Sequence, residues 1–320
     1  MEGHLVYGAT GSGTNYYNLA KDLSAINSKN EEVTSRDGHL MGYIVNVSAF
    51  STGNGLLTFS TIPNTWRVRN AFRKFHFARD LMFDQAGITK SERGKYGQTI
   101  RPFFSVDHFN DGVSINEEVP IVMKVTSSVV NPSIGAITGG EWTYSSLASQ
   151  PTLQEGQLAK DLDLSLVDEW NLHVLGGNYQ EDVASSQSTW KSVGMVTSYN
   201  KDRMDPLPDA DNANYPGSAI SKSNNPLAAL RTQNLGTGEV LEIAKEQEEE
   251  KPPYDISDDG DSVDASIALM TYMSSSAEAA FRRLGTIFVP AGLLCVQSSA
   301  ASINGLNLEI VGKVMCKDFA

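Results

Sequence analysis

Short runs of alternating apolar or β-branched residues, each bounded by turn-forming residues, recur along most of this 320-residue sequence. The runs lie at residues 43–47, 56–59, 121–125, 142–144, 170–175, 192–196, 286–289, 292–296 and 306–311. Such runs are typical of β-strands, and Asn304-Gly305 between two apolar runs predicts a hairpin turn. Eight or more short strands without regular helical alternation favour an all-β sandwich or barrel. The 27 Gly and 12 Pro argue against coiled coils and helical solenoids.

Two segments carry helical patterns. Residues 66–86 place apolar side chains at spacings near three and four and stop before Gly87, which predicts an amphipathic helix. We expect this helix to pack Phe72, Phe75 and Met82 onto a sheet. A short helical turn is expected at residues 227–230.

The strand pattern predicts a single domain over residues 1–320, with residues 1–40 as an extended N-terminal segment. Residues 200–226 are rich in Asn, Asp, Pro, Ser and Gly, and residues 245–266 combine an acidic run with Pro252-Pro253. Both segments predict long surface loops.

Charge is distributed unevenly along the chain. The net charge of −13 and the pI of about 4.8 argue against a protein that coats nucleic acid with its whole surface. Residues 66–101 nevertheless hold nine cations against three anions, a net charge of +6, whereas residues 239–264 have a net charge of −9. No apolar run approaches 18 residues, so we expect no contact with a membrane.

The basic stretch interleaves cations with aromatic residues. This mixture can neutralise phosphates and stack on unpaired bases, although a solvated helix face with structural arginines would look the same in sequence. The candidate nucleic-acid contacts are Arg67, Arg69, Arg73, Lys74, Arg93, Lys95 and Arg101.

The acidic stretch predicts a contact between subunits. The residues concerned are Asp255, Asp258, Asp259, Asp261 and Asp264. Two partners would neutralise them: Arg93, Lys95 and Arg101 of a neighbouring copy, or Ca²⁺ held by Asp255, Asp259 and Asp261. An EF-hand loop would need Glu where Ser266 stands, so we favour charge pairing and expect no resident cofactor.

Catalytic motifs give no reason to expect an enzyme. Residues 8–14 nearly spell a phosphate-binding loop, but Thr14 and Asn15 replace the Lys and Ser/Thr that it requires. The five histidines are scattered, and Cys295 and Cys316 belong to no metal-binding spacing.

Three stretches together resemble a known family. They are residues 69–76 running on to 94–102, residues 170–176 with 192–199, and residues 225–227 through 252–255 to 288–293. The combination resembles the capsid proteins of uncultured circular Rep-encoding single-stranded DNA viruses of environmental and faecal origin. The resemblance implies a jelly-roll shell protein, located in the virion, that self-assembles into a small icosahedral particle around single-stranded DNA. A β-sandwich adhesin or receptor-binding module is the alternative that the composition leaves open.

One feature departs from that family. Capsid proteins of that kind usually begin with an arm rich in Arg and Lys that neutralises packaged DNA, whereas residues 1–20 here contain neither. Residues 66–101 therefore remain as the expected basic surface toward a packaged genome.

Overall fold

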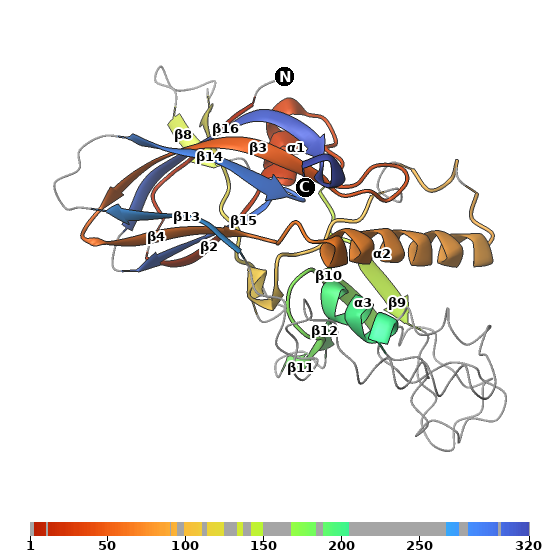
Figure 1. Cartoon of the computed structure of the whole chain (residues 1–320). Coiled ribbons are helices and arrows are strands. Elements are labelled where there is room, and N and C mark those ends of the chain that lie inside the picture. The colour runs from red at the N-terminus through yellow and green to blue at the C-terminus, as the bar shows by residue number, and fades with distance from the viewer. Residues whose placement is uncertain are drawn as a thin grey trace.

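Antiparallel β-sheets make up most of the fold, as the strand pattern predicts (Figure 1). The computed structural model describes residues 3–10, 12–89, 91–94, 99–110, 114–124, 133–136, 142–149, 168–183, 188–204, 267–274, 281–299 and 302–319.

Two four-stranded antiparallel sheets form a sandwich. One has the order β1 (His4–Tyr7), β16 (Ser302–Met315), β3 (Met41–Thr52) and β14 (Arg282–Pro290). The other has the order β13 (Ile267–Ser274), β4 (Gly55–Thr61), β15 (Leu293–Ser299) and β2 (Gly13–Asn18). Along β3, Tyr43, Val45 and Val47 are buried while the residues between them are partly exposed. Because buried and exposed residues alternate along the strand, one face of each sheet points toward a shared apolar core.

The segment expected to be extended, residues 1–40, instead supplies β1, β2 and the helix α1 (Leu19–Asn27). The Asn18 side chain caps α1 by accepting a hydrogen bond of 3.2 Å from the Lys21 amide. Leu5, Tyr17 and Leu19 are fully buried, so these elements belong to the core.

The expected hairpin turn at Asn304-Gly305 is wrong, because both residues lie inside β16. The pairing of β16 with β3 shifts register between Ile303 and Gly305. A Cβ at Gly305 would come within 2.6 Å of the Phe281 ring, so this glycine permits close packing within a bulged strand.

A long insertion separates β4 from β13. Because Thr61 of β4 pairs with Ile267 of β13, the insertion leaves and re-enters the sandwich at one end. Its helices are α2 (Trp66–Gln85) and α3 (Met195–Met204). Its strands are β5 (Phe109–Asn110), β6 (Ser114–Ile115), β7 (Ile121–Lys124), β8 (Ser133–Ala136), β9 (Ser146–Ser149), β10 (Asp168–His173), β11 (Tyr179–Val183) and β12 (Ser188–Gly194). Single 3₁₀ turns occur at Val106–His108 and Cys316–Phe319.

Within the insertion, β11, β12, β10 and β9 form a third sheet, in which β10 and β12 run parallel. Strands were also expected at 142–144 and across 192–196. Residues 142–144 form no strand, and β12 ends at Gly194, where α3 begins.

The predicted helix over residues 66–86 is confirmed as α2. Thr65 caps it, and Phe72 and Phe75 are buried. The expectation that Met82 packs onto a sheet is wrong: this side chain is 39% exposed. The helix extends beyond the end of the sandwich and lies against α3 (Figure 1). Residues 200–204, expected in a loop, complete α3, whereas the expected turn at 227–230 and the loops over 205–226 and 245–266 lie outside the described residues.

Candidate functional site

Four of the seven candidate nucleic-acid contacts lie together on the first turns of α2. Arg67, Arg69, Arg73 and Lys74 are all half-buried. The Arg69 guanidinium donates to the Asn64 carbonyl and side-chain oxygens at 3.3 and 3.2 Å. The Arg73 guanidinium lies 6.0 Å from the centroid of the Phe77 ring. These side chains keep part of their charge at the surface.

Arg93 is held by its own chain. Its guanidinium bonds Asp80 at 2.9 Å and Asp84 at 2.5 Å, and its side chain is 4% exposed. These bonds tie the turn after α2 back onto the helix. Arg93 is therefore poorly placed to meet a phosphate or the acidic segment of a neighbouring copy.

Arg101 does not serve as a surface contact, contrary to expectation. Only 2% of the residue is exposed, its guanidinium donates to the Asn30 side chain, and it stacks on Trp142. Aromatic stacking and a buried hydrogen bond identify a structural arginine. Lys95 lies outside the described residues.

The acidic subunit-contact candidates, Asp255, Asp258, Asp259, Asp261 and Asp264, also lie outside the described residues, and so does the Ca²⁺ prediction that rests on three of them. Within the described part of the chain, no three His, Cys, Asp or Glu side chains gather in a way that could hold a metal ion.

Sequence reasoning missed a buried polar junction between the sandwich and the insertion. Glu117 of the insertion accepts hydrogen bonds from Lys21 of α1 and, at 2.8 Å, from the Tyr144 hydroxyl. Asn18 in turn donates to the Tyr144 oxygen at 2.9 Å, and the His108 ring lies 3.7 Å from Glu117. No sequence motif predicts this cluster, because its members are up to 126 residues apart in sequence.

The charges of this junction are balanced inside the protein. Burial alone would raise the pKa of Glu117, but the neighbouring His108 ring and the charge of Lys21 hold it below its usual value. Nearby, burial raises the pKa of Asp22 well above its usual range, while a 2.5 Å hydrogen bond from Tyr7 opposes that rise. The junction fixes the insertion to the sandwich.

His173 and Ser192 form a second buried polar pair. The Nε2 atom of His173 donates to the Gly177 carbonyl at 2.9 Å, and its Nδ1 faces the Ser192 hydroxyl. Burial lowers the pKa of His173 to about 4, so the ring is neutral at physiological pH. Both residues are fully buried, and the pair connects β10 to β12.

A shallow pocket of about 360 Å³ opens between the second sheet and the turn over residues 104–107. Its walls include Tyr16, Ser60, Asp107 and Cys295. Burial raises the pKa of the Cys295 thiol, which disfavours the reactive thiolate. The thiol of Cys295 is therefore not activated as a nucleophile.

The chain matches no protein-family model, and it has no significant similarity to a curated protein or to a solved structure. Among the helices of the described residues, none is both long and apolar enough to cross a membrane.

Proposed function

We propose that this protein is a jelly-roll capsid subunit that self-assembles into a closed shell. The strand order carries the proposal. Counted along the chain, the sandwich strands β1, β2, β3, β4, β13, β14, β15 and β16 are strands one to eight. The sheets then have the orders 1-8-3-6 and 2-7-4-5, and these orders support an eight-stranded jelly roll with two Greek keys.

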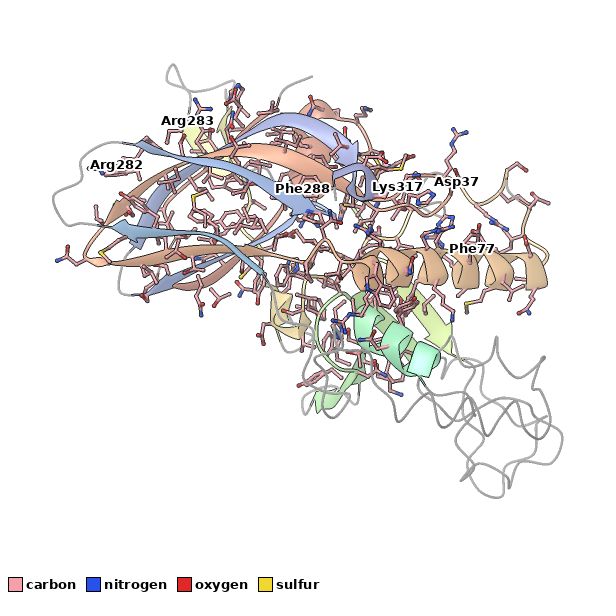
Figure 2. All side chains as sticks on the ribbon, in the orientation of Figure 1. Asp37, Phe77, Arg282, Arg283, Phe288 and Lys317 are labelled. Carbon is pink, nitrogen blue, oxygen red and sulfur yellow. The ribbon has the colours of Figure 1, made fainter. Side chains whose placement is uncertain are left out.

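Exposed apolar side chains favour assembly over a monomeric module. Met273 of β13 is 76% exposed, Val311 of β16 is 62% exposed, and Phe77 and Phe281 are each 53% exposed. Figure 2 places Phe77 on α2 and Arg282 and Arg283, which follow Phe281, at the opposite end of the molecule. Large apolar groups exposed at both ends suit a subunit with neighbours on several sides.

The acidic composition is compatible with such a particle, because a net charge of −13 per chain keeps assembled shells apart in solution. We further propose that the shell, located in the virion, encloses single-stranded DNA. The side chains of Arg93 and Arg101 are buried within the subunit. The candidate cations for phosphate contacts are therefore Arg67, Arg69, Arg73 and Lys74.

Sedimentation velocity of the purified full chain tests this proposal. A capsid subunit sediments as one megadalton species, and nuclease-resistant absorbance at 260 nm in that species reports enclosed nucleic acid. A monomer or trimer at all concentrations would instead support the adhesin alternative. Particles without protected nucleic acid would support the proposed shell but contradict the proposal that this chain alone packages a genome.

A further inference from the structure

A row of exposed apolar side chains follows the distal half of α2. Phe77 is 53% exposed and Leu81, one turn later, is 39% exposed. The proximal half of the same side is covered by α3, since the Tyr199 hydroxyl accepts from Asn70 at 3.3 Å. Seven residues complete nearly two turns, so Phe77 lies almost directly above Asn70 along the helix. The row therefore continues a surface on which another helix already packs.

A positively charged residue precedes the row and a negatively charged residue follows it, at equal spacing in sequence. Lys74 precedes Phe77 by three residues, Leu81 follows Phe77 by four, and Asp84 follows Leu81 by three. The spacing three-four-three is the same in both directions and has its centre at position 79. A two-fold axis at that centre would bring Phe77 opposite Leu81 of a second copy, and Lys74 opposite Asp84 of that copy.

We propose that α2 binds α2 of a second copy of this chain in antiparallel orientation, through Lys74, Phe77, Leu81 and Asp84. A parallel pair would place Lys74 against Lys74 and Asp84 against Asp84, so the charges select the antiparallel arrangement. Under this proposal Lys74 serves the subunit contact and not the phosphate contact considered above.

The acidic partner is accessible. The Asp84 side chain is 66% exposed, and Arg93 bonds its Oδ1 atom. The exposed Asp84 carboxylate can therefore meet a cation from a second copy while its Oδ1 atom holds Arg93. The Arg73 guanidinium beside Phe77 adds a second positive charge at the same end of the row.

This contact would form one of the interfaces between subunits of the proposed shell. The inference therefore rests on the proposed function. A single helix pair buries less than the roughly 1,200 Å² of a standard stable interface, so an isolated pair associates weakly. Several such contacts around each subunit would reinforce one another in a closed shell.

Two neighbouring residues provide a matched test. Leu81 and Met82 are each 39% exposed, but they point about 100° apart around the helix, and only Leu81 lies in the row. We expect Leu81→Asp to weaken self-association of the full chain roughly tenfold or more, because it places a carboxylate against an apolar partner. Met82→Asp should leave the association unchanged. Equal effects of the two variants, with native circular dichroism for both, would overturn the proposal.

Engineered cysteines test the register and the orientation. In the antiparallel pair, position 74 of one copy faces position 84 of the other, while two copies of position 74 are offset by about 15 Å along the helix. A mixture of Lys74→Cys and Asp84→Cys proteins should therefore form the mixed disulfide dimer, and each protein alone should not. The native Cys295 and Cys316 are buried and do not compete.

The outcomes separate this contact from the proposed function. Dimers from Lys74→Cys alone, or equal dimer formation in all mixtures, would overturn the antiparallel pairing. Mixed dimers without particles would support the pairing and contradict the shell. Particles without mixed dimers would support the shell and contradict the pairing.

Discussion

The guanidinium of Arg101 lies 4.1 Å from the centroid of the Trp142 ring, in the buried interior of the molecule. In sequence, this arginine closes a basic stretch with a net charge of +6. In the fold, it joins the segment after α2 to Trp142 of the insertion and to Asn30, which follows α1. Its positive charge therefore contributes to cohesion within one subunit.

Replacement of this arginine should affect stability. We expect Arg101→Ala to reduce the free energy of unfolding by roughly 2–3 kcal/mol, because it removes a buried stack and a buried hydrogen bond. Arg283→Ala, at an exposed arginine, should change it by less than about 0.5 kcal/mol. Urea denaturation measures both. Unchanged stability with reduced binding of single-stranded DNA would restore Arg101 as a nucleic-acid contact.

Two phenylalanines of α2 should behave differently. Phe72 is fully buried and Phe77 is 53% exposed. Phe72→Ala should lower the free energy of unfolding by roughly 3–5 kcal/mol because it leaves a cavity, whereas Phe77→Ala removes a surface ring and should have a much smaller effect. Thermal denaturation followed by circular dichroism makes the comparison. Similar losses for both variants would contradict the orientation of α2.

Protonation of His173 should destabilise the fold. Its pKa is about 4 in the folded protein, against about 6.5 in the unfolded chain. The unfolded chain therefore binds more protons between these values, and the contribution of His173 is complete above pH 6.5 and lost as the pH falls toward 4. From pH 7 to pH 5 the loss should be about 2 kcal/mol.

The His173→Gln variant isolates this contribution, since the other titrating groups are common to both proteins. The wild type should lose about 2 kcal/mol more than the variant between pH 7 and pH 5 in urea denaturation. Identical pH dependence of the two proteins would show that burial does not shift the pKa of His173.

Gly194, at the junction of β12 and α3, should not tolerate a side chain. A Cβ there would lie 1.9 Å from the Gly176 carbonyl oxygen. Gly194→Ala should destabilise the protein by about 3 kcal/mol or reduce its soluble yield. Gly177→Ala is the control, because a Cβ at Gly177 meets no atom within 4 Å. A stable Gly194→Ala protein would contradict the close approach of these two backbones.

Periodicity was sufficient to predict α2 and five of the eight sandwich strands, but not β1, β2 or β13. The alternation in residues 43–47 and the helical spacing of Phe72 and Phe75 are local patterns. Periodicity did not predict α1, whose cap at Asn18 is a single residue, or the bulge at Gly305, where an Asn-Gly pair typical of turns lies inside a strand. The close approach of the Phe281 ring to Gly305 joins residues on different strands and is not a local pattern.

The candidate site was harder to predict than the fold, because burial is not encoded in a run of charges. Arg67 and Arg101 look alike in sequence, but the first is half-buried on α2 and the second is enclosed by Trp142 and Asn30. The junction around Glu117 brings together residues whose separation in sequence hides their contact. Contacts of this kind follow from topology and are visible only in the folded chain.

Negative-stain electron microscopy of the purified full-length chain tests the central claim most directly. A jelly-roll shell subunit predicts closed, roughly spherical particles of uniform diameter that contain many copies of the chain. A uniform population of monomers or small oligomers, with the protein folded and at concentrations that reach the micromolar range, would contradict the assignment as a capsid subunit.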